Sequence, residues 1–152
     1  PQIDVGIPVL IPSDYVPDLG VRLALYRRIA ALTDRSAIEC FAAEMFDRFG
    51  SLPAEVENLF STVSIKQQCR AAGIEKLEAG PKGAIISFRN SEFNNPLGLV
   101  EFITAQSGTA KLRPDHKLVF SRVWKEKPDR LSGVQYLIQQ LANLASVPET
   151  LN

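Results

Sequence analysis

The sequence has little of the residue types on which most enzymes and metal sites depend. Its 152 residues include only two cysteines, Cys40 and Cys69, and one histidine, His116. The cysteines are far apart and each falls within a predicted helix, so neither a disulfide framework nor a zinc knuckle is indicated. His116 stands beside Asp115 in a predicted turn, where both residue types are common for backbone reasons. We therefore expect neither a metal nor a cofactor in this chain.

Motifs for catalysis are also missing. Nucleophilic catalysis needs a serine or cysteine activated by a base that a third group holds, and no such set can be identified here. The loop at residues 80–83 (GPKG) has neither the spacing nor the hydroxyl residue of a phosphate-binding loop. We expect no enzymatic activity, and an enzyme with an unfamiliar site is the weakest alternative.

No sign of charge dominates, and no long hydrophobic run is present. The 17 basic and 17 acidic residues give no overall field that would attract nucleic acid or an anionic membrane. No stretch approaches the roughly 20 apolar residues that span a bilayer. The chain starts at Pro1, without an initiating methionine or a leader. These features predict a cytoplasmic protein without membrane contact, excised as a piece from a longer chain.

The hydrophobic content of 45% is enough for one core. We predict an α+β fold, with an N-terminal three-helix segment followed by antiparallel hairpins and two further helices in a single compact domain. The domain spans 1–152, with an extended and turn-rich lead-in at 1–18, a core over 19–146 and a frayed tail at 147–152. The predicted helices are 19–33, 36–50, 53–72, 95–106 and 129–145, and the predicted strands are 74–79, 84–88, 110–112 and 117–121.

The most informative stretch is residues 44–53 (EMFDRFGSLP), which ends one helix and begins the next. Gly50 suits the left-handed conformation that stops a helix, and Pro53 suits the first position of the following one. Ser36 with Glu39 three residues later predicts a capping box at the start of this second helix. Its buried stripe is predicted to consist of Ile38, Phe41, Ala42, Met45 and Phe49.

Glu44 and Asp47 are candidate interface residues. They are three apart and share one helix face, and the apolar stripe places that face away from the core. We predict that both carboxylates face solvent and are available to a basic partner. A plainer interpretation stays open, because Glu44 is four residues before Arg48 and the two can form an ordinary surface ion pair.

A second function class rests on the second predicted hairpin. Nucleic acid would be contacted there by basic side chains together with Phe120 and Trp124. Alternation of basic and apolar residues is, however, what any half-buried strand shows. A nucleic-acid-contacting accessory module is therefore the alternative function. Its basic residues would be Lys111, Arg113, Lys117, Arg122, Lys125 and Lys127.

Several segments occur in a fixed order and spacing. They are 11–18 (IPSDYVPD), 22–23 (RL), 26–30 (YRRIA), 44–50 (EMFDRFG) and 52–53 (LP). Together they closely resemble the C-terminal domain of bacterial transcription-repair coupling factor, Mfd. The resemblance is specific over residues 8–88 and looser beyond them, and Phe46 stands where a smaller aliphatic residue is more usual.

The resemblance implies a regulatory role. The parent protein of that family is a DNA translocase that uses ATP and Mg on other domains, acts on stalled RNA polymerase and recruits the repair protein UvrA. Its C-terminal domain resembles an autoinhibitory clamp that packs on the UvrB-like N-terminal module of the same protein and masks the UvrA-binding surface. By this resemblance, Glu44 and Asp47 pair with basic residues of that module. Direct DNA contact is not expected.

Overall fold

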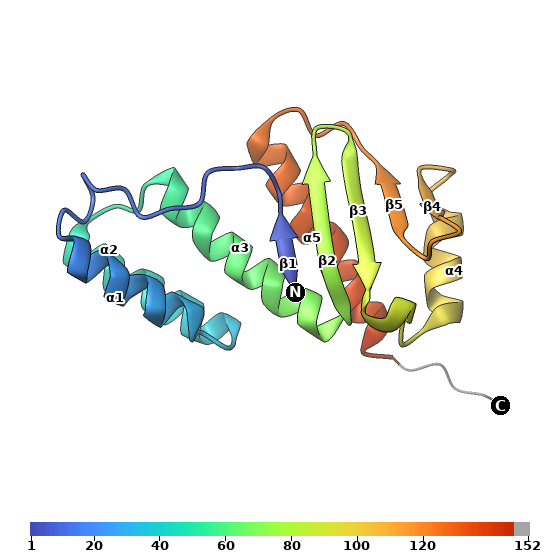
Figure 1. Ribbon diagram of the computed structural model, residues 1–152, viewed down its shortest axis with the longest axis horizontal. Coiled ribbons are helices and arrows are strands. Elements are labelled where there is room, and N and C mark those ends of the chain that lie inside the picture. The colour runs from blue at the N-terminus through green and yellow to red at the C-terminus, as the bar shows by residue number, and fades with distance from the viewer. Residues whose placement is uncertain (148–152) are drawn as a thin grey trace. The chain divides into compact units, whose positions relative to one another are not determined.

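In the computed structural model, which describes residues 1–147, the chain divides into two compact units. Residues 7–67 form the helical unit, and residues 1–6 together with 68–147 form the sheet unit (Figure 1). The α+β class is confirmed: three helices come first, and one further helix follows each of the two hairpins. That residues 1–152 form one domain stays a prediction, and the predicted frayed tail lies, from residue 148 on, outside the described residues.

The helical unit starts its helices with aspartate caps. Asp18 accepts a hydrogen bond from the N–H of Val21, and Asp34 accepts one from the N–H of Ala37, both at 2.8 Å. The predicted capping box at Ser36 is therefore wrong, because the helix is capped two residues earlier, by the Asp34 carboxylate at its positive end. The helices of this unit are α1 (Leu19–Ala30), α2 (Arg35–Phe49) and α3 (Ala54–Ala71), of which α3 continues into the sheet unit.

One apolar cluster fills the helical unit. On α1, Leu25 and Ile29 are buried, whereas Leu19 and Leu23 are 61% and 47% exposed. Within each pair the residues are four apart, so both pairs fit a buried helical stripe. Packing against the other helices determines that Leu25 and Ile29 are the buried pair. The cluster consists of Ile11, Val16, Leu25, Ile29, Ile38, Phe41, Met45, Val56 and Phe60.

The sheet unit contains a five-stranded sheet in the order β1-β2-β3-β5-β4. β1 runs parallel to β2, and the other neighbours are antiparallel, so both predicted hairpins are confirmed. Gly80 pairs with Gly83, which shortens the first hairpin turn to Pro81 and Lys82. The elements are β1 (Gln2–Asp4), β2 (Ile74–Gly80), β3 (Gly83–Phe88), the 3-10 helix η1 (Arg89–Ser91), α4 (Pro96–Ala105), β4 (Ala110–Leu112), β5 (Leu118–Ser121) and α5 (Lys127–Ala145).

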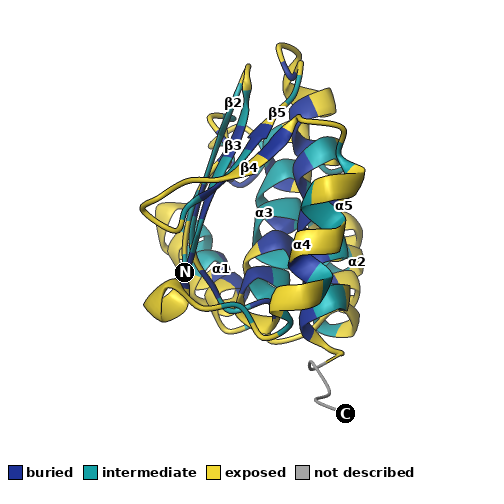
Figure 2. Ribbon diagram, turned by 90° about the vertical axis from the view of Figure 1, so that its right-hand side faces the viewer, coloured by how far each residue is buried: buried dark blue, intermediate teal, exposed yellow. Residues whose placement is uncertain are grey.

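The two faces of the sheet differ. Helices α4 and α5 lie on the same side of the strands, and α5 contacts β2 (Figure 2). On the opposite face Ile85 and Val119 are only half-buried. Alternation along the strands therefore produces one core face and one open face. The core face and α5 together bury Leu77, Ile86, Leu118, Phe120, Val134, Ile138 and Leu141.

A buried arginine joins the two ends of the sheet unit. Arg130 of α5 is 6% exposed, and its guanidinium donates to the carbonyl oxygens of Val5 at 3.1 Å, Gly6 at 3.3 Å, Trp124 at 3.1 Å and Lys125 at 3.5 Å. A buried charge is costly unless its donors are bonded, and here the carbonyl oxygens do this. Arg130 therefore fastens the segment after β1 to the start of α5.

We expect Gly133→Ala to lower the stability of the chain. A Cβ built at Gly133 would lie 2.5 Å from the ring of the buried Trp124, so ring or helix must shift. Overpacking of this kind costs about 1–3 kcal/mol, measurable by chemical denaturation. Gly80→Ala is the matched control, because nothing lies within 4 Å of a Cβ at Gly80. Equal stability of the two variants would contradict the described packing.

Candidate functional site

The candidate site lies on α2, whose C-terminal end and buried face follow the sequence prediction. Ile38, Phe41 and Met45 are buried. Gly50 ends the helix with φ at 92°, and its N–H donates to the carbonyl of Phe46 at 2.9 Å. Packing of this buried face fixes the orientation of α2 in the helical unit. The positions of its exposed side chains are fixed with it.

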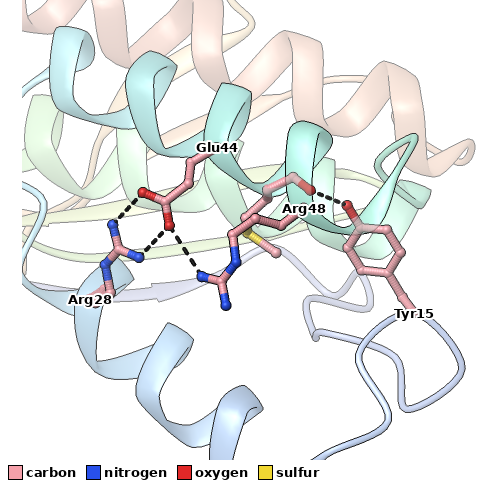
Figure 3. Close-up of polar contacts among 5 residues, drawn as sticks. Tyr15, Arg28, Glu44 and Arg48 are labelled. Atoms are coloured by element: carbon pink, nitrogen blue, oxygen red, sulfur yellow. Dashed lines mark hydrogen bonds and ion pairs between the residues drawn. The ribbon is translucent and has the colours of Figure 1, made fainter.

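Glu44 is bound by arginines of its own unit (Figure 3). Arg28 of α1 donates to both carboxylate oxygens, with 2.8 Å between its Nη2 and Oε1, and Arg48 donates from Nη1 to Oε2 at 3.3 Å. The prediction that Glu44 is free in solvent is thus wrong, because its side chain, 37% exposed, is within reach of two cations. The simpler prediction of an ion pair with Arg48 is confirmed, and Arg28 was missed.

The three residues form a fixed group, which we call the α1–α2 ion triad (Arg28, Glu44 and Arg48). Each arginine also lies over an aromatic ring, Arg28 at 4.5 Å from the centre of Phe41 and Arg48 at 4.8 Å from that of Phe49. The hydrogen bond from Arg28 lowers the pKa of Glu44 to about 2, and Arg48 adds to this effect. Glu44 is therefore ionised at neutral pH and already paired.

Asp47, in contrast, is exposed, and it forms no ion pair within residues 1–147. Phe46 beside it is 55% exposed, and Ala43 and Cys40 continue the same surface toward the start of the helix. We call Cys40, Ala43, Phe46 and Asp47 the outer face of α2. The structure thus separates the two predicted carboxylates: one is held in the triad, and the other is accessible.

Tyr15 fastens the lead-in segment to the end of α2. Its hydroxyl donates to the carbonyl oxygens of Gly50 at 2.8 Å and Met45 at 3.3 Å, and its ring packs on Phe49 with 5.8 Å between ring centres. Burial raises the pKa of the Tyr15 hydroxyl, so it remains a donor at neutral pH. Tyr15 therefore holds the lead-in segment against the last turn of α2 and the residue that ends it.

His116 lies exposed in the turn between β4 and β5, with φ at 66°. The neighbouring Asp115 accepts hydrogen bonds from the side chain of Arg113 and, at 3.2 Å, from the N–H of Lys117. Within residues 1–147, no three His, Cys, Asp or Glu side chains gather as a metal site would require. Nor does any helix in that range have the length and apolar composition needed to cross a membrane.

The residues proposed for nucleic-acid contact are arranged differently from the prediction. Phe120 and Trp124 are 1% and 7% exposed, so they belong to the core and offer no surface for base stacking. Arg113 is paired with Asp115, and Arg122 is bonded to side chains of its own unit. The aromatic part of this alternative is therefore wrong.

Comparison with known proteins bears directly on the family. A family model described as "TRCF domain" matches residues 5–99, more than half of the chain. The chain belongs to the TRCF domain family. The resemblance found in the sequence is thereby confirmed.

Relatives of the TRCF domain extend this result. The transcription-repair-coupling factor of Rickettsia conorii is 41% identical over 128 residues, which are 84% of this chain and 11% of that protein. The one from Escherichia coli K12 is 31% identical over 140 residues, 92% of this chain and 12% of that protein. The chain thus spans about a tenth of the length of these curated relatives.

The fold has a counterpart among solved structures. A crystal structure of the C-terminal domain of a transcription-repair coupling factor matches with a TM-score of 0.80. The match covers 95% of this chain and 93% of that one at 22% identity. At this identity the likeness shows the fold of the TRCF domain and nothing further.

The ion triad makes stability depend on pH. Because folding lowers the pKa of Glu44 from 4.5 to about 2, its contribution is complete above about pH 4.5 and is lost as the pH falls toward 2. We expect Glu44→Gln to melt at a lower temperature than wild type above pH 4.5, with the difference disappearing near pH 2. Thermal melts by circular dichroism test this.

The control for this prediction is Glu39→Gln. Glu39 is also on α2, but its pair with Arg35 is far more exposed, at 68% and 88% for the two side chains. A smaller change is expected there, since exposed pairs contribute little. A melting difference for Glu44→Gln that stays constant across the pH range would show that the carboxylate charge is not responsible.

Proposed function

We propose that this chain is a regulatory interaction domain of a transcription-repair coupling factor. In this proposal it packs on the UvrB-like N-terminal module of the same cytoplasmic protein and masks the surface that UvrA binds. ATP, Mg and RNA polymerase are engaged by other parts of the parent. Membership of the TRCF domain family supports the assignment to a transcription-repair coupling factor. The observation that carries the proposal is the outer face of α2, where Asp47 and Phe46 stand exposed side by side.

The two exposed residues suit an interface for different reasons. Aromatic side chains are enriched among the residues that contribute most to binding, and Phe46 offers a large apolar surface on a rigid helix. Asp47 has no ion pair within the described residues 1–147, so its charge is available to a basic side chain of the partner. Both features point to a partner surface that combines an apolar pocket with basic residues.

Glu44 has a different part in this interface. Its carboxylate already accepts from Arg28 and Arg48, so a basic residue of the partner would have to share it or displace one arginine. We assign direct contact to Asp47, and we assign to Glu44 the positioning of α1 against α2 through Arg28 and Arg48. Charge reversal at Glu44 therefore disturbs the interface through the triad.

A single contact of this kind can control the closed state, in which this domain is packed on the N-terminal module. With an effective concentration of about 1 mM from the tether and a dissociation constant near ~10 µM, the closed form is favoured by roughly 100 to 1. Loss of about 3 kcal/mol, within the range for a desolvated charge pair, removes that preference. One charge reversal on the outer face of α2 is then enough to open the clamp.

We expect Asp47→Lys to raise UvrA binding by the full-length protein. The same change should weaken binding of this domain to the separately expressed N-terminal module by about tenfold or more, because an attractive pair becomes repulsive. Titration calorimetry measures the second effect. Glu101→Lys, on the exposed side of α4 in the sheet unit, is the matched control and should change neither. Unchanged affinities in the Asp47 variant would overturn the proposal.

Cys40 provides an independent readout of the same surface. It lies seven residues before Asp47 on the outer face of α2, whereas Cys69 is fully buried and burial raises the pKa of its thiol to about 12. A thiol reagent should modify only Cys40 in the folded domain. We expect saturating N-terminal module to slow this reaction, and Asp47→Lys to abolish the protection. A reaction rate that the module leaves unchanged would place the interface elsewhere.

A further inference from the structure

Helix α1 carries a second apolar stripe besides the one that faces the core. Leu19, Leu23, Tyr26 and Ala30 follow one another at intervals of four, three and four residues. This is the spacing of the seam along which two helices pack in a coiled coil. Leu19 and Leu23 are 61% and 47% exposed, Ala30 is exposed and Tyr26 is half-buried. We call these four residues the α1 seam.

The α1 seam lies on the side of α1 away from α2. Arg28, which donates to Glu44 of α2, follows Leu19 by nine residues, or about two and a half helical turns. Arg28 and Leu19 therefore point to opposite sides of α1. The buried pair Leu25 and Ile29 faces the core. The seam is thus separate from the core of the helical unit, from the α1–α2 ion triad and from the outer face of α2.

The lead-in segment fixes one side chain of the seam. The N–H of Ile11 donates to the hydroxyl oxygen of Tyr26 at 2.7 Å, so the Tyr26 ring is held in place. Leu10, directly before the residue that Tyr26 bonds, is 43% exposed. A side chain that is ordered before a partner arrives loses less conformational entropy on binding.

Arginines flank the α1 seam on both sides. Arg22 and Arg27 lie at the positions that border the apolar residues of a coiled coil and pair with charges of the partner helix. Arg22 donates to the carbonyl oxygens of Val16 at 2.7 Å and Pro17 at 3.0 Å, which holds its side chain in place. Neither arginine forms an ion pair within residues 1–147. Helix α1 itself contains no acidic residue.

The charges decide between the possible occupants of the seam. A second copy of this chain would bring the arginines of one α1 close to those of the other, and like charges at these positions repel. An anionic membrane would attract the arginines, but helices at a membrane surface bury a broad apolar face. Here Leu25 and Ile29 face the core, which leaves only a narrow stripe outward. An acidic helix matches both the seam and its flanks.

We propose that the α1 seam binds an amphipathic helix of another polypeptide, whose apolar residues recur at intervals of three and four and whose flanking residues are acidic. Such a helix would pack its apolar residues on the seam and place carboxylates beside Arg22 and Arg27. The 12 residues of α1 span about 18 Å, so the contact is short and its affinity is low. This binding goes beyond the regulatory function proposed above and does not depend on it.

The test is a titration of the isotope-labelled chain with a synthetic helical peptide, followed by nuclear magnetic resonance. Each heptad of the peptide has leucine at the two apolar positions, glutamate at the flanking positions, and alanine and glutamine elsewhere. We expect the backbone amide resonances of residues 19–30 to shift. A peptide with lysine in place of glutamate should bind about tenfold more weakly or worse. Asp47→Lys should leave binding unchanged, which separates this surface from the regulatory interface.

Two exposed leucines provide a matched pair of variants. Leu23→Glu places a carboxylate in the seam and should weaken binding of the acidic peptide by about tenfold or more, because an apolar contact is lost and like charges meet. Leu97→Glu, on α4 of the sheet unit and 57% exposed, should leave binding unchanged. Arg27→Glu should weaken binding of the acidic peptide and strengthen binding of the lysine peptide, each by about tenfold.

Three results would overturn the proposal. The first is no shift of residues 19–30 at millimolar peptide, and the second is equal binding by Leu23→Glu and Leu97→Glu. The third is another occupant of the seam: self-association measured by sedimentation, or binding to vesicles of anionic lipid, that Leu23→Glu abolishes. The seam would then serve a second copy of the chain or a membrane.

Discussion

The buried guanidinium of Arg130 is the interaction on which the sheet unit most depends. Taking such a charge out of water costs several kcal/mol, and within residues 1–147 no carboxylate pairs with it. Four backbone carbonyls satisfy it instead, two of them just after β1 and two just before α5. β1 has only three residues and lies parallel at an edge, so its own ladder bonds are few. Its place in the sheet therefore relies on Arg130, and Gly6, with φ at 64°, lets the chain turn so closely past it.

In the helical unit, partly exposed charges hold neighbouring elements together. Glu44 is attractive to any basic surface, and the nearest one is Arg28 on the neighbouring helix. An internal arginine is always present at high effective concentration, so it outcompetes a partner unless the partner offers more than charge. The two predicted carboxylates therefore have different roles. Glu44 stabilises the arrangement of α1 and α2, and Asp47, without an internal partner in residues 1–147, retains the capacity to bind.

Local patterns allowed much of this fold to be predicted from sequence. The predicted helix 95–106 is present as α4, which Asn95 caps by accepting from the N–H of Gly98, and Gly50 ends α2 as predicted, because both effects act within one helical turn. The ion pair of Glu44 with Arg48 was likewise within reach, since the two are four residues apart. Arg28 is sixteen residues from Glu44, and no helical period links them.

Long-range contacts account for the other differences between prediction and structure. Arg130 bonds to a carbonyl 125 residues away, and the parallel pairing of β1 with β2 joins Ile3 to Leu77. Neither contact can be predicted from composition or from hydrophobic periodicity. From sequence alone, an arginine on an amphipathic helix is expected at the surface, and its burial becomes evident only from its tertiary neighbours.

The outer face of α2 presents only side chains, because helical backbone groups are bonded within the helix, so its specificity depends on the identity of Phe46 and Asp47. Such a surface suits one fixed partner, such as another module of the same protein.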